Sequence, residues 1–128
     1  MENTNGYRVL SGSNLQGTDV RTPADESIGE IKDIMIDVST GEVLYAVLSV
    51  STGFLNLENK YFAVAWKALD FNKYRAADDN DHVITLDVSK ERLEKSPGFD
   101  KDNWPSHADS DFANSVNSYY GVEVHRTL

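Results

Sequence analysis

The chain has 128 residues, of which 40% are hydrophobic, enough for one domain with a modest core. Its formal net charge is −9, and its basic residues are scattered singly, so nucleic acid and anionic membranes are disfavoured as partners. The absence of cysteine excludes disulfides, thiolate metal ligands and cysteine nucleophiles. No segment approaches the roughly 18 apolar residues of a membrane span and no leader opens the chain, so we expect a soluble cytoplasmic protein.

The beginning of the chain is polar. Residues 1–14 are rich in Asn, Ser, Gly and Thr, and we expect them to form a flexible N-terminal arm. A first strand is expected from Leu15 to Arg21, and the polar residues 23–26 predict a turn after it. The main β domain is expected to span residues 15–96.

The most regular pattern in the chain predicts a β-hairpin over residues 27–50. Apolar residues alternate with other types along its first strand, which predicts a strand with one buried face. These alternating residues are Ile34, Ile36 and Val38. A turn is expected at residues 39–41. The strand after it is apolar on both faces over residues 43–48, which predicts a central position in a small closed sheet.

Two more strands are expected farther along. The first runs from Tyr61 to Trp66, and the second runs from Val83 to Val88 after a polar, Asp-rich turn. The loop before Tyr61 is more apolar than a plain connector requires, which makes it a candidate surface for receiving another segment. Its apolar residues are Phe54, Leu55 and Leu57. Short strands at regular spacing predict an all-β protein, a small β-barrel or roll.

The last third of the chain changes character and predicts helices. Ser89 is a suitable N-cap for a short helix through Lys95, which Pro97 and Gly98 would stop. An irregular segment with two large aromatic residues follows. A second helix is expected from about Ser110 to Tyr120, closed by Gly121. We expect residues 97–128 to form a short α-helical, aromatic C-terminal arm.

This arm carries a large apolar load for a segment outside a barrel. Its candidate interaction residues are Phe99, Trp104, Phe112, Val116, Tyr119 and Tyr120. One interpretation is that the arm folds back on its own barrel as core. The other is that it wraps a neighbouring subunit or a protein partner, because Trp and Tyr are favoured anchors at interfaces.

Catalytic patterns are not found in the sequence, so we expect a protein that is not an enzyme and uses no cofactor. Phosphate-binding loops, nucleophile elbows and HExxH zinc patterns do not occur. His82, His107 and His125 lie in separate loops or tails without ligand spacing. Asp33 and Asp37 lie four residues apart on a strand, so they project to one face as a candidate acidic surface pair.

Two Asp-rich turns are weak candidates for divalent-ion binding. Residues 78–82 offer oxygen ligands, and so do Asp100 and Asp102. Both lack the spaced acids and central glycine of an EF-hand loop. The simpler interpretation is that these turns are solvated, and we expect no metal site.

Several segments resemble the PRC-barrel domain family, named for the H subunit of the photosynthetic reaction centre and shared with a ribosome-maturation factor. The similar segments are Leu15–Val20, Ile28–Asp37, Gly41–Val43 and Phe62–Trp66. Many members have proline in place of Ala65. The resemblance covers roughly residues 15–88 and implies an all-β barrel that serves as an assembly or adaptor module, without catalytic residues.

The C-terminal arm is similar to that of a stand-alone bacterial subgroup of this family. The matching segments are Glu91–Asp100, Asn103–Pro105 and Tyr119–Gly121. We expect a protein-interaction module that forms a homodimer or higher homo-oligomer through its arm. The alternatives are an accessory protein of photosynthetic or respiratory electron transfer and a weak divalent-metal binder.

Overall fold

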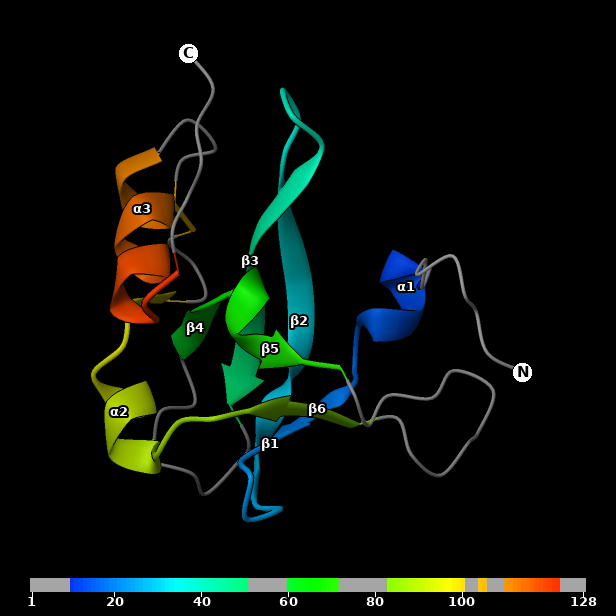
Figure 1. Cartoon of the computed structure of the whole chain (residues 1–128), viewed down its shortest axis with the longest axis vertical. Coiled ribbons are helices and arrows are strands. Elements are labelled where there is room, and N and C mark those ends of the chain that lie inside the picture. The colour runs from blue at the N-terminus through cyan, green and yellow to red at the C-terminus, as the bar shows by residue number, and fades with distance from the viewer. Residues whose placement is uncertain (1–9, 51–59, 72–82, 101–103, 106–109, 123–128) are drawn as a thin grey trace.

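The computed structural model describes residues 10–50, 60–71, 83–100, 104–105 and 110–122, and its strands form one sheet in the order β5-β6-β1-β2-β3-β4-β7 (Figure 1). The strands are β1 (Asp19–Arg21), β2 (Ser27–Asp37), β3 (Glu42–Val50), β4 (Lys60–Ala65), β5 (Leu69–Asp70), β6 (Val83–Leu86) and β7 (Gly98–Asp100). Neighbours are antiparallel except β1 and β6, which pair in parallel. The short helices are α1 (Gly12–Leu15), η1 (Trp66–Ala68), α2 (Lys90–Glu94) and α3 (Ser110–Tyr119). The predicted all-β fold with a helical C-terminal segment is confirmed.

The predicted hairpin is formed by β2 and β3, the two longest strands. Its turn is closed by the Asp37 carbonyl, which accepts hydrogen bonds from the Thr40 N–H at 3.2 Å and the Gly41 N–H at 2.7 Å. Gly41 has φ +79°, a left-handed conformation that glycine adopts without strain. The turn therefore needs glycine at its last position.

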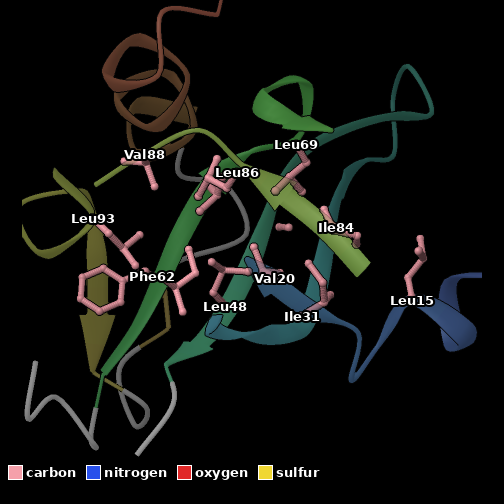
Figure 2. Packing of buried hydrophobic residues seen from close by; sticks show 13 residues of the cluster. Leu15, Val20, Ile31, Leu48, Phe62, Leu69, Ile84, Leu86, Val88 and Leu93 are labelled. Carbon is pink, nitrogen blue, oxygen red and sulfur yellow. The ribbon is translucent and has the colours of Figure 1, made fainter. Parts of the chain in front are cut away.

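The first core lies on one face of the sheet, where side chains from β1 to β6 converge (Figure 2). Val20, Ile28, Leu48 and Ile84 are fully buried there. Burying one such side chain is worth about 1.5–3 kcal/mol. The residues that a strand contributes to this core alternate along it, as Ile84 and Leu86 of β6 do.

A second core covers the other face of β3 and β4. Tyr45, Val47 and Tyr61 project from the two strands and pack against Phe99 of β7 and Val116 of α3. Each face of β3 therefore contributes its apolar residues to one of the two cores. This confirms the predicted central position of this strand.

The prediction of a strand from Leu15 to Arg21 is wrong for its first half. Leu15 ends α1 and is buried, and the strand β1 begins only at Asp19. Gly17, with φ +84°, separates the two elements. The helix α1 starts at Gly12, within the segment that was expected to be an arm.

A second difference is β7, which lies in the segment expected to be irregular. Gly98 to Asp100 pair with Phe62 to Lys60 of β4. Pro97 and Gly98 are poor strand formers, so no local signal predicted this strand. Glycine is required at position 98 because an added Cβ would lie 2.7 Å from the Tyr61 carbonyl oxygen.

The remaining elements agree with the sequence pattern. Ser89 caps α2 through its Oγ, which accepts a hydrogen bond from the Arg92 N–H at 3.1 Å. α3 ends beside Gly121, which has the positive φ of a C-terminal cap, +71°. The helices α2 and α3 lie on the same side of the molecule (Figure 1).

Candidate interaction surface at the end of the hairpin

The far end of the hairpin projects beyond the strands that flank its base (Figure 1). β1 pairs with β2 only along Ser27–Glu30, and β4 pairs with β3 only along Tyr45–Ser49. Among the described strands, Asp33–Asp37 therefore has β3 as its single neighbour. We call the segment from Asp33 to Leu44 the distal hairpin.

The distal hairpin exposes apolar side chains. Val38 is 92% exposed and Ile36 is 55% exposed, whereas Ile34 is half-buried. The expectation that these three residues share a buried face is therefore wrong for Ile36 and Val38. Strand alternation determines which residues share a face, but not whether another element covers that face.

Beside these residues lies a groove of about 440 Å³ between α1 and the distal hairpin. Its apolar lining consists of Leu10, Leu15, Ile34, Ile36, Val43 and Trp66. Leu15 and Ile34 belong to the first core or pack against it, so the groove opens from the edge of that core. We call this hollow the hairpin groove.

The backbone edge of β2 changes partner along its length. The Ile31 N–H donates to the Thr18 carbonyl at 3.0 Å, and Gln16 Nε2 donates to the Lys32 carbonyl at 3.4 Å. Lys32 is the extra residue of a β-bulge, since Ile31 and Asp33 pair with adjacent residues of β3. Beyond this bulge no described strand pairs with the edge.

Asp33 and Asp37, the predicted acidic surface pair, lie along the distal hairpin. Asp33 Oδ1 accepts a hydrogen bond from the Ile34 N–H at 2.8 Å, and Asp37 Oδ1 accepts one from the Ser39 N–H at 3.0 Å. Each carboxylate therefore holds local backbone: Asp33 at the strand edge and Asp37 at the turn. Asp33 also lines the hairpin groove.

The aromatic residues of the C-terminal arm pack on the barrel of their own chain. Phe99 and Val116 are buried in the second core, and Phe112 packs against it. The rings of Phe112 and Tyr45 lie edge to face with centroids 5.6 Å apart. Trp104 is 37% exposed and contacts Phe99, with ring centroids 5.0 Å apart.

Tyr119 joins α3 to α2. Its hydroxyl donates to the Arg92 carbonyl at 2.6 Å, and the Arg92 guanidinium donates back to the Tyr119 carbonyl. The guanidinium also lies 4.6 Å from the centre of the Tyr119 ring, a cation–π distance. These reciprocal contacts hold the two helices together.

Tyr120 follows as a half-buried residue that packs against both cores. Burial raises the pKa of its hydroxyl to about 12, against a smaller opposing effect of the nearby Ser96 side chain. Its hydroxyl oxygen is shielded from solvent and makes no geometrically good hydrogen bond within the described part of the chain. This hydroxyl therefore stays protonated at neutral pH.

Several predicted residues lie outside the described ranges. Phe54, Leu55 and Leu57 of the apolar loop, the Asp-rich turn at 78–82 and Asp102 are among them. Within the described ranges, acidic and histidine side chains form no group of three that could hold a metal ion. The helices described there are also too short or too polar to cross a membrane.

The hairpin groove was not predicted from the sequence. It depends on α1 folding beside β2 and on Trp66 reaching it from the end of β4, and neither contact has a local signal. The exposed pair Ile36 and Val38 has the same pattern as a core strand. Only the lengths of the neighbouring strands show that these residues are uncovered.

Comparison with known proteins agrees with this architecture. A family model described as PRC-barrel domain matches residues 8–93, which is more than half of the chain. No curated protein matches the chain. The matched range includes α1, the whole hairpin and every strand up to β6. The chain belongs to the PRC-barrel domain family.

Proposed function

We propose that this protein is a non-enzymatic protein-interaction module, and that its contact surface is the distal hairpin together with the hairpin groove. The observation that carries the proposal is the exposure of Val38 and Ile36, at 92% and 55%, beside an apolar groove. Apolar side chains grouped in this way mark interaction sites on soluble domains.

The surface is suited to a polypeptide. A strand edge offers main-chain hydrogen bonds to an added strand, and an adjacent apolar groove selects its side chains. The groove lining has one ionisable residue, Asp33, whose Oδ1 is bound to the Ile34 N–H. A partner that inserts apolar side chains here therefore has few charges to desolvate.

Self-association through the C-terminal arm stays a prediction. Phe99 and Val116 are used in the core of their own chain, so such a contact would rely on residues that are partly exposed, such as Trp104 and Tyr119. We therefore place the main contact surface at the distal hairpin. No feature of the described residues favours the electron-transfer accessory or the metal binder, and a cytoplasmic location is likewise a prediction.

Affinity capture from the host lysate tests the function. Three baits are compared: the natural chain, Ile36→Lys, and Asn114→Lys, which adds the same charge at an exposed position of α3. We expect a reproducible foreign protein with the natural chain and Asn114→Lys, and its loss with Ile36→Lys. Equal capture by all three baits, or no foreign protein at all, would contradict an interaction module acting through this surface.

A further inference from the structure

We propose that the distal hairpin binds an extended segment of a foreign protein in which basic and apolar residues alternate. The segment has a Lys or Arg, an apolar residue, any residue, a second apolar residue and a second Lys or Arg. It pairs with Asp33–Asp37, the last part of β2. The inference rests on the proposed function and names the chemistry of the partner for the same surface.

The last part of β2 has an open backbone edge. The strand runs from Asp33 to Asp37, and within the described part of the chain its neighbour there is β3. The Asp37 carbonyl is directed toward the turn into β3, where it accepts a hydrogen bond from the Gly41 N–H. Successive residues of a strand direct their backbone groups to opposite edges, so those of Ile34 and Ile36 are directed to the open edge. Such an edge is a template for another strand.

The side chains along this edge form two rows of different chemistry. Ile34 and Ile36 line the hairpin groove, whereas Met35 between them packs against the second core. Asp33 and Asp37 occupy the same alternate positions as Met35, one at each end of the row. The Asp33 carboxylate bends to the open edge, where it accepts the hydrogen bond of the Ile34 N–H and contributes to the groove lining. One row is therefore apolar, and the other is acidic at both ends.

Charge selects a basic partner. The distal hairpin contains three carboxylates, Asp33, Asp37 and Glu42, and it contains no Lys, Arg or His. Glu42 Oε2 lies 3.8 Å from Lys67 Nζ, so Asp33 and Asp37 are the carboxylates best placed for a partner. The nearest basic residue along β2 is Lys32, in the bulge outside the paired stretch. Opposite charges that face each other on paired strands are stabilising, so basic residues are favoured opposite Asp33 and Asp37.

The same register determines the apolar positions of the partner. When its basic residues face Asp33 and Asp37, its second and fourth residues lie opposite Ile34 and Ile36, on the side of the hairpin groove. A groove of about 440 Å³ is large enough for two aliphatic side chains. The middle residue faces Met35 and is unrestricted. The pattern is the same when read from either end, so it holds for parallel and antiparallel pairing.

The chain itself lacks this pattern, which argues for a foreign partner over a second copy. Among its 12 Lys and Arg residues, no two lie four positions apart. Each copy also carries a formal net charge of −9, so a second copy is repelled whereas a basic partner is attracted. We therefore expect binding that weakens as the salt concentration rises.

Fluorescence anisotropy with labelled synthetic peptides tests the proposal on the full chain. The first probe has the core Lys-Val-Thr-Val-Lys between short Gly-Ser ends, with both termini blocked so that its charge comes from the core alone. A scrambled probe, Lys-Lys-Val-Val-Thr, keeps the composition and charge without the alternation, and Glu-Val-Thr-Val-Glu reverses the charge. Both comparison probes should bind at least about fivefold more weakly than the first. Equal binding of the first and the scrambled probe would overturn the proposal.

Variants of the chain test the two carboxylates. Asp33→Asn combined with Asp37→Asn removes both charges and keeps the oxygens that hold the local backbone. Glu91→Gln combined with Glu94→Gln removes the same charge from exposed positions at α2. The first pair should weaken binding of the first probe by about fivefold, and the control pair by much less. Equal weakening would show that only net charge attracts the peptide, and would overturn the proposed register.

The outcomes separate this inference from the proposed function. If the first probe does not bind but a foreign protein is still captured through Ile36, the interaction module stands and the proposed partner chemistry is overturned. If the first probe binds and Ile36→Lys abolishes its binding, the peptide site is supported even when the lysate yields no partner. Self-association that Ile36→Lys removes, without binding of the first probe, would identify a second copy as the occupant and overturn the inference.

Discussion

The two halves of the β2–β3 hairpin have similar alternating sequences and different environments. At the base, Leu48 and Val47 are both fully buried, because β1 and β4 flank the hairpin and each face is covered by a core. In the distal hairpin, Ile36 and Val38 are exposed, and β3 is the single neighbouring strand in the described part of the chain. Residue pattern therefore specifies a strand, whereas the length of the neighbouring strands decides whether that strand becomes core or surface.

The largest expected effect comes from shortening one apolar side chain in each half. Leu48→Ala should lower the free energy of unfolding by about 2–5 kcal/mol, because it leaves a cavity in the first core. Ile36→Ala should lower it by less than about 1 kcal/mol, since the side chain is 55% exposed. Urea unfolding at low protein concentration measures both. Equal losses would show that the distal hairpin is covered as well as the base.

Glycine substitutions probe the backbone of the two halves of the hairpin. Gly29 lies in the base, and an added Cβ would come within 2.4 Å of the Ser49 carbonyl oxygen, so Gly29→Ala should cost about 2–4 kcal/mol. Gly41 lies in the distal turn with no atom near its absent Cβ, so Gly41→Ala should cost about 1–2 kcal/mol from its positive φ alone. Thermal unfolding of the two variants gives the ranking, and a reversed ranking would contradict it.

The smallest expected effect on stability comes from Tyr120, in the C-terminal arm that packs against the second core. Burial raises the pKa of Tyr120 to about 12, from 10 in the unfolded chain, so the folded state keeps this proton to higher pH. The resulting stabilisation, about 2–3 kcal/mol at most, is full below pH 10 and is lost as the pH rises toward 12. Tyr120→Phe removes a hydroxyl without a good partner, so it should be nearly neutral at pH 7.

The measurement for Tyr120 is the difference in unfolding free energy between the natural chain and Tyr120→Phe. That difference cancels the titration of the other tyrosines and the lysines. It should stay constant from pH 7 to 9 and shift against the natural chain above pH 10. A difference that stays constant up to the highest accessible pH would mean that the arm does not bury Tyr120.

Local sequence signals predicted much of the fold. The hairpin, its turn at Gly41, the N-cap at Ser89 and the helix before Gly121 all have short-range causes, and each was found. The strand β7 was missed because its stability comes from pairing with β4, which lies almost 40 residues earlier in the chain. The parallel pairing of β1 with β6 likewise has no local signal.

The candidate site was less accessible to sequence reasoning than the fold. Five large aromatic residues in the arm left two interpretations open, the core of the same chain or an interface, and in the structure Phe99 is buried and Phe112 packs on the second core of its own chain. The apolar pattern of Ile36 and Val38 indicated core, and these residues are exposed. Both predictions turned on which surfaces meet in three dimensions, and hydrophobicity alone carries no information about that.

Leu48 at the base of the hairpin is core, whereas Ile36 in the distal hairpin is exposed. Amide hydrogen exchange distinguishes the two halves residue by residue. The Ile36 amide should exchange at least about tenfold faster than the Leu48 amide. Equal protection of the two amides would contradict this account of the hairpin.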